Sequence, residues 1–303
     1  MLTALEAGVR FVDTAPHYGR GLSERRVGDA LRTRDRVVLS TKVGRLLLPD
    51  PSIHNDDERD CFRSPMPFRP AYDYTYDGVL RSHEASLQRL GLARVNILFV
   101  HDIGRMTHGD SNATHWRQLN EGGGFKALQQ LRNQGAIDAF GIGVNEIEAC
   151  LVALKETPLD VVLLAGRYTL LEQEAMDELL PACSATNTSV IVGAPYNSGI
   201  LASGARADRA PRYNYSAAPQ AVVERVAQIE RIADAHATPM AAAALQFPLA
   251  HPSVASVIPG QSGPEEVRAT LSFFHHPIPR AFWEELRAEG LLRDDAPTPD
   301  RVN

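Results

Sequence analysis

The chain has 303 residues, of which 44% are apolar, and its 31 basic and 37 acidic residues leave a formal net charge of −6. This size and composition suit one large buried core, so we expect a single barrel domain over residues 1–303. The acidic balance gives no sign of a nucleic-acid or membrane partner, and the apolar runs are too short to cross a bilayer.

The three cysteines, Cys61, Cys150 and Cys183, are an odd number without the spacing of a metal site. They are typical of reduced thiols in a cytoplasm, and are more often buried or incidental than catalytic. Helical sequence begins directly at Met1 and does not resemble a signal peptide. We therefore expect a cytoplasmic protein without a metal.

Strand and helix patterns alternate along the chain after Gly8, which is expected to end a first helix over 1–7. Short apolar runs predict seven strands, at 9–13, 36–42, 94–100, 138–144, 159–165, 189–194 and 254–259. Helical patterns cover 22–33, 77–91, 123–135, 146–156, 171–186, 217–250 and 264–274. Ser23 and Asp77 are expected to cap two of these helices.

Apolar strands that alternate with helices predict a parallel sheet covered by helices. The pattern favours an α/β fold of the (β/α)8 TIM-barrel type over an open doubly wound sheet, because no G-x-G-x-x-G motif follows a strand. A closed barrel of this type has eight strands, and we find seven. We therefore expect the sequence as given to lack an upstream first strand, which analysis of the native N-terminus would test.

Three long connections, 43–76, 101–122 and 195–216, each follow a strand, so we expect them on one face of the barrel. Connections of this length are usually functional or disordered. The first carries five prolines with Tyr72 and Tyr74, which suggests the wall of a pocket.

Polar side chains end three successive predicted strands: Asp13, Lys42 and His101. Neighbouring strands lie about 4.8 Å apart, so Asp13 and Lys42 can form an ion pair. Tyr18 follows in the loop after Asp13, and a lysine beside its hydroxyl is expected to lower its pKa by as much as roughly three units. Each residue alone would more often be structural, but together they suit proton transfer at a C–O bond.

Such a tyrosine is a general acid for a carbonyl oxygen and a base for an alcohol. Hydride transfer at the same carbon requires a cofactor, because no side chain supplies a hydride.

The segments FVDTAPHYGRGLSERRVGDAL, LSTKVG and LFVHD resemble the aldo-keto reductase superfamily over the length of the chain. The resemblance implies a (β/α)8 barrel that binds a nicotinamide dinucleotide at its mouth. It also implies that Asp13, Tyr18, Lys42 and His101 form a catalytic tetrad, with Tyr18 as proton donor or acceptor and His101 as the group that positions substrate.

Further segments, RYTLLEQ, GGGF and HDIGRMTHG, resemble the bacterial sugar dehydrogenases, including L-fucose and D-threo-aldose 1-dehydrogenases. Pyridoxal 4-dehydrogenase and L-galactose dehydrogenase are nearby branches. The resemblance therefore implies oxidation of an aldose at C1 to a lactone. The alternatives are a pyridoxal 4-dehydrogenase or general aldehyde or ketone reductase and, in another class, a non-catalytic nucleotide-binding barrel. Oligomeric state and physiological direction stay open.

The resemblance also implies the residues that would hold the dinucleotide. NADP-using relatives carry a lysine after Ile-Pro and an arginine some six residues on, where this chain has Gly260 and Glu266. A carboxylate repels a 2′-phosphate and can accept from a ribose hydroxyl, so NAD is expected to be preferred over NADP. The remaining candidates are Asn145 for the carboxamide and, for the pyrophosphate loop, Ala194, Pro195, Ser198 and Gly199.

Overall fold

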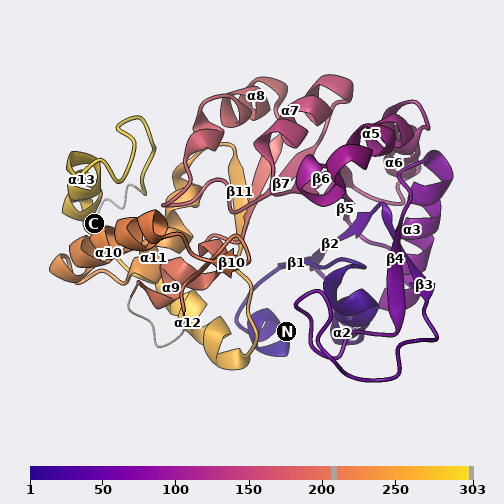
Figure 1. Cartoon of the computed structure of the whole chain (residues 1–303), viewed down its shortest axis with the longest axis horizontal. Helices are drawn as coiled ribbons and strands as arrows, with labels where there is room; N and C mark the ends of the chain where they lie inside the picture. The colour runs from indigo at the N-terminus through magenta and orange to yellow at the C-terminus, as the bar shows by residue number, and fades with distance from the viewer. Residues whose placement is uncertain (206–209, 300–303) are drawn as a thin grey trace. The chain divides into compact units, whose positions relative to one another are not determined.

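The computed structural model describes residues 1–205 and 210–299 (Figure 1). The chain divides into two compact units, the first Met1–Val144 with Glu148–Val162 and the second Asn145–Ile147 with Leu163–Asn303. The single domain expected over 1–303 stays a prediction.

In the first unit, four strands lie side by side in the order β1-β2-β5-β6, each pair parallel. These strands are β1 (Phe11–Asp13), β2 (Val38–Val43), β5 (Ile97–His101) and β6 (Ala139–Val144). The helices are α1 (Leu2–Glu6), the 3-10 turn η1 (Tyr18–Gly21), α2 (Leu22–Leu31), α3 (Tyr76–Leu90), α4 (Arg105–His108), η2 (Gly109–Ser111), α5 (Asn112–Asn120), α6 (Gly124–Asn133) and α7 (Ile147–Glu156). The sequence-based strands are confirmed here to within three residues, because buried apolar runs mark central parallel strands.

Strand β7 (Val161–Ala165) runs from the first unit into the second, where β8 (Ser189–Gly193) and β11 (Val254–Ile258) pair in parallel. The other elements of the second unit are η3 (Glu174–Met176), α8 (Leu179–Thr186), η4 (Asn197–Gly199), α9 (Ile200–Ser203), β9 (Arg212–Tyr213), β10 (Ser216–Ala217), α10 (Gln220–Ala235), α11 (Met240–Gln246), η5 (Phe247–Ala250), α12 (Pro264–His275) and α13 (Arg280–Ala288). The long helix expected over 217–250 is divided, because Pro239 stands between α10 and α11 and cannot continue a helix.

Two helix caps differ from those expected. Thr75, not Asp77, caps α3, and its hydroxyl accepts from the Gly78 N–H at 3.2 Å. Gly21, in a left-handed conformation, occupies the N-cap position of α2, and the Ser23 hydroxyl instead shares a 2.8 Å hydrogen bond with Thr14.

The connection 43–76 contains an antiparallel hairpin that the sequence did not suggest, β3 (Arg45–Pro49) paired with β4 (Phe68–Tyr72). It lies near α3 in Figure 1. Its strands lack an apolar alternation, and Pro70 within β4 argues against a central strand but is tolerated at the edge of a two-stranded ribbon. Within the described residues, no helix combines the length and apolarity needed to span a membrane.

Candidate active site

The register of the first two parallel strands places Asp13 next to Lys42. Asp13 lies opposite Ser40, and Lys42 projects to the same side as Ser40 because side chains two residues apart share a face. The Lys42 Nζ donates to Asp13 Oδ2 at 2.5 Å and to the Thr14 carbonyl at 3.0 Å, while Ser40 Oγ donates to Asp13 Oδ1 at 2.6 Å. Burial opposes the charge on Lys42, but Asp13 and Tyr18 outweigh it and raise the pKa of Lys42 to about 12.

The structure brings Tyr18 and His101 to this ion pair. Lys42 Nζ lies 4.7 Å from the centroid of the Tyr18 ring. The Tyr18 and His101 rings meet nearly at right angles, with centroids 6.0 Å apart. All four residues expected at the site therefore gather within the first unit.

The expectation that Lys42 lowers the pKa of Tyr18 is wrong in its net direction. Burial disfavours the phenolate and is the largest influence, so the pKa of Tyr18 is raised, although Lys42 acts against this rise. The sequence revealed the neighbouring charge and not the burial. Tyr18 is consequently a neutral phenol at neutral pH, which suits a proton donor.

His101 is a buried, neutral imidazole. Burial, followed by the charges of Arg45 and Lys42, holds the pKa of His101 well below its usual value. The hydroxyl of Tyr74 donates to the His101 carbonyl at 2.7 Å and shares a 2.9 Å hydrogen bond with His108 Nε2. Tyr74 and His108 therefore fix the backbone at the end of β5.

Four residues around Tyr18 were not anticipated as part of the site. The rings of His17 and Phe62 lie 6.2 Å from the Tyr18 ring, and the charges of Arg20 and Arg45 act on His17. The His17 ring lies 5.9 Å from the His101 ring and 5.1 Å from that of Phe62. Burial and then the charges of Arg45 and Arg20 lower the pKa of His17 to about 3. His17 precedes Tyr18 and Arg20 follows it by two residues, so the sequence could have suggested both; nothing in the sequence pointed to Phe62.

The second unit contains the residues proposed for the dinucleotide. Ala194 and Ser198 have left-handed φ values of 48° and 60°, and Gly199 has 99°. Pro195, which follows Ala194, is buried. Ser198 Oγ accepts from the Tyr215 N–H at 3.1 Å. Residues 206–209 of the connection 195–216 lie outside the described residues. Left-handed non-glycine residues cost free energy and concentrate at ligand sites, so this loop fits the role that the resemblance implies.

The other cofactor candidates occupy separate places in that unit. Asn145 Nδ2 donates to the Ala165 carbonyl at 3.4 Å, and Gly260 is exposed after β11. Glu266, on the first turn of α12, accepts from the Ser262 N–H at 2.6 Å and from its hydroxyl at 2.7 Å. These hydrogen bonds hold a carboxylate at the helix start and lower the pKa of Glu266.

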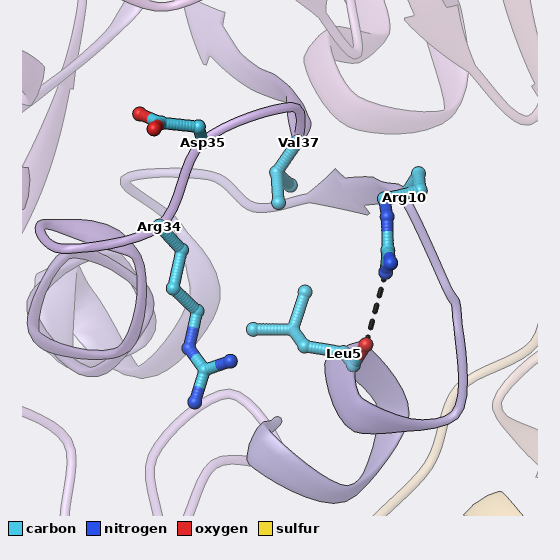
Figure 2. Close-up of a pocket in the computed structure, with 5 residues that line it drawn as sticks. All are labelled: Leu5, Arg10, Arg34, Asp35 and Val37. Carbon is cyan, nitrogen blue, oxygen red and sulfur yellow. Dashed lines mark hydrogen bonds between the residues drawn. The ribbon is translucent and has the colours of Figure 1, made fainter.

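A pocket of about 250 Å³ lies in the first unit, away from this chemistry (Figure 2). It is lined by Leu5, Arg10, Arg34, Asp35 and Val37. Arg10 and Val37 precede β1 and β2, so the pocket lies at the amino ends of strands whose carboxyl ends carry Asp13 and Lys42. It is therefore not the site that holds Tyr18.

Comparison with known proteins gives consistent matches. The model of the Aldo/keto reductase family matches residues 1–289. Pyridoxal 4-dehydrogenase of Microbacterium luteolum is 41% identical over 295 residues, which cover 95% of this chain and 86% of that protein. D-threo-aldose 1-dehydrogenase of a Pseudomonas species is 39% identical over 300 residues, covering 98% and 87%.

A solved structure, the holo form of an aldo-keto reductase from Bacillus halodurans, matches with a TM-score of 0.70 at 22% identity. The match covers 99% of this chain and 87% of that one. It confirms an α/β fold of the TIM-barrel class, whereas the missing first strand stays a prediction.

Proposed function

The chain belongs to the aldo/keto reductase family and is an oxidoreductase, and from that premise we propose that it oxidises an aldose at C1 to a lactone. The observation that carries the proposal is the contact of Tyr18 with the buried Lys42–Asp13 pair and with His101. The name of the D-threo-aldose 1-dehydrogenase relative supports the substrate class.

The proposed catalytic roles follow from the contacts. A nicotinamide dinucleotide, when bound, would supply the acceptor for the C1 hydride. The Tyr18 oxygen takes the proton of the C1 hydroxyl, so that the hemiacetal loses one hydride and one proton and becomes a lactone. Lys42 stabilises the phenolate that this step requires, Asp13 keeps Lys42 charged and in place, and the neutral His101 hydrogen-bonds the reacting oxygen.

The same residues also serve the reverse direction. A neutral Tyr18 donates its proton to a carbonyl oxygen during reduction, and its raised pKa keeps that proton available at neutral pH. Reduction of an aldehyde or ketone is therefore the alternative activity. Pyridoxal is the specific alternative substrate, because the pyridoxal 4-dehydrogenase relative is as similar as the aldose enzyme.

For the cofactor, we infer NAD over NADP. Glu266 presents a carboxylate where NADP-using relatives carry a cation, and Gly260 supplies no charge. The nearby Arg268 forms an exposed ion pair with Glu265, which weakens its attraction for a 2′-phosphate. A higher kcat/KM with NADP than with NAD would overturn this choice.

A substrate panel tests the proposed function. L-fucose, L-galactose, D-arabinose and pyridoxal are each incubated with NAD and with NADP, and reduced nucleotide is followed by absorbance. We expect an aldose with NAD to give the highest kcat/KM. A highest value for pyridoxal would support the alternative, and no turnover with any member would contradict both.

A further inference from the structure

The surroundings of Tyr18 contain buried nitrogen atoms for which the described residues provide no hydrogen-bond partner. These atoms are Arg20 Nε and Nη1, Arg45 Nε, His17 Nδ1 and His101 Nδ1. Arg20 is 8% exposed and Arg45 is 6% exposed, so their guanidinium groups are almost entirely removed from bulk water. A buried donor without a partner costs about 1–3 kcal/mol, which a ligand can recover by accepting from it.

Arg20 is held rigidly among these groups. It has a left-handed φ of 54°, a conformation that is costly for a residue with a side chain and is typical of functional loops. Its N–H donates to the His17 carbonyl at 3.1 Å, and its Nη2 pairs with Asp60. Asp60 belongs to the connection between β3 and β4, which is also joined to this turn by the Met66 N–H donating to the Gly19 carbonyl at 3.0 Å.

The same connection supplies an apolar ring. Phe62, two residues after Asp60, lies 6.2 Å from the Tyr18 ring and 5.1 Å from the His17 ring. The Tyr18 surroundings therefore combine an aromatic ring with the unpartnered guanidinium donors of Arg20 and Arg45.

The charges indicate which oxygen these donors suit. Lys42 pairs with Asp13, Arg45 with Asp102 and Arg20 with Asp60. Each of these three cations is thus matched by a carboxylate, and His17 is neutral. Arg59, whose charge also acts on Arg20, donates to the Asn55 and Pro65 carbonyls. The spare donors of Arg20 and Arg45 therefore belong to cations that are already paired, which favours neutral hydroxyl oxygens over a phosphate or carboxylate.

We propose that Arg20 is a specificity residue that donates from Nε and Nη1 to a hydroxyl oxygen of the substrate away from the reacting carbon. The inference rests on the proposed function and adds to it the residue that selects polyhydroxylated substrates. Arg45 occupies a similar place but also pairs with Asp102 beside His101, so Arg20 gives the cleaner test.

Two substitutions separate the roles of Arg20. Arg20→Lys keeps a cation for Asp60 and leaves the backbone conformation unchanged, but removes the spare guanidinium donors. Asp60→Asn weakens the ion pair and keeps those donors. Arg63→Lys makes the same chemical change at an exposed residue of the same connection and is the matched control.

Each variant is assayed with two cyclic hemiacetals, L-fucose and tetrahydropyran-2-ol, which share the reacting group but differ in ring hydroxyls. We expect Arg20→Lys to lower kcat/KM for L-fucose about 10- to 100-fold, mainly through KM, because the charge-assisted hydrogen bonding to one hydroxyl oxygen is lost. Its kcat/KM for tetrahydropyran-2-ol should change less than about threefold, which also shows that the variant is folded. Asp60→Asn should lose less on L-fucose than Arg20→Lys, and Arg63→Lys should match the wild type.

Equal losses on both hemiacetals, or a larger loss on L-fucose in Asp60→Asn than in Arg20→Lys, would assign Arg20 a purely structural role and overturn the inference. A larger loss of kcat/KM in Arg20→Lys with a carboxylated sugar than with L-fucose would overturn the assignment of a neutral hydroxyl as the group that Arg20 binds. If the wild type oxidises neither hemiacetal, the proposed function fails and the Arg20 role fails with it. If the wild type oxidises both hemiacetals and Arg20→Lys has the wild-type kcat/KM on both, only the Arg20 role is overturned.

Discussion

The pKa of Tyr18 determines how the rates of oxidation and reduction depend on pH. Burial raises this pKa, so the neutral phenol persists through the neutral range and well into the alkaline range. Carbonyl reduction needs the protonated form, whereas C1 oxidation needs the phenolate.

We therefore expect kcat/KM for oxidation of the aldose to rise as the pH increases from 7 to 10, while kcat/KM for carbonyl reduction stays nearly flat. Steady-state rates in a constant-ionic-strength buffer series measure both. A plateau of the oxidation rate already at pH 7 would mean that the phenolate forms easily and would contradict the dominance of burial.

For the individual site residues, the sequence predicted which side chains meet. It did not predict whether burial or the neighbouring charge decides the pKa of Tyr18. Asp13, Lys42 and His101 end neighbouring strands, and strand spacing alone brings Asp13 and Lys42 into contact. The burial of Tyr18 and the approach of Phe62 depend on how the connection 43–76 folds back. Only long-range packing determines that path, so the pKa direction was predicted wrongly.

Among the secondary-structure elements, the packing of α2 against α3 gives the sharpest test. Glu24 on α2 is buried, its carboxylate accepting from Arg89 Nε of α3 at 2.5 Å and from Thr41 Oγ1 of β2 at 2.8 Å. Gly28, one turn further along α2, lies against the end of α3, and a Cβ built there would be 1.7 Å from the Leu90 carbonyl oxygen.

Gly28→Ala should therefore destabilise the protein, although alanine is favoured over glycine in a helix by about 1 kcal/mol. We expect a loss of about 2 kcal/mol or more, since backbone must move to admit the methyl group. Asp29→Ala, at an exposed neighbour on the same helix, is the control and should be close to neutral. Urea unfolding measures both, and a Gly28→Ala variant as stable as the wild type would refute the close packing.

Strands were easier to predict than the connections between them. Continuous apolar runs such as Ile97–Val100 have few alternatives to a buried strand. The β3–β4 hairpin and the short helices of 101–122 have no comparable pattern. Helix α13 lies after the last strand, where the alternation of strand and helix patterns no longer predicts an element. The helical pattern predicted over 77–91 stops at the observed C-cap of α3, Gly91, whose left-handed φ of 64° is one that glycine adopts without cost.

For the whole molecule, the half-buried His17 and the buried His108 should make the protein sensitive to acid. Burial first, then neighbouring cations, lowers the pKa of His17 to about 3 and that of His108 to about 4. Unfolded histidines titrate near pH 6.5, so below that pH the unfolded chain binds more protons than the folded one. The free energy of unfolding should therefore fall as the pH drops from 6.5 towards 4.

Urea midpoints between pH 7.5 and 4.5 measure this loss. His108→Gln keeps a hydrogen-bonding side chain without a titrating ring, and we expect it to show a smaller fall with acid than the wild type. His54→Gln changes an exposed histidine and should retain the wild-type slope. Parallel slopes for all three proteins would exclude His108 from the acid response.

The proposed reaction depends on Tyr18 as the group that moves the proton. The most direct measurement compares Tyr18→Phe with the wild type, following turnover of the preferred aldose and, in parallel, the Kd of the dinucleotide by fluorescence. Loss of the phenol should lower kcat by about 10²- to 10⁴-fold, the usual contribution of a general acid or base, and leave dinucleotide binding nearly unchanged. Turnover by Tyr18→Phe within a few-fold of the wild type would show that Tyr18 does not move the proton.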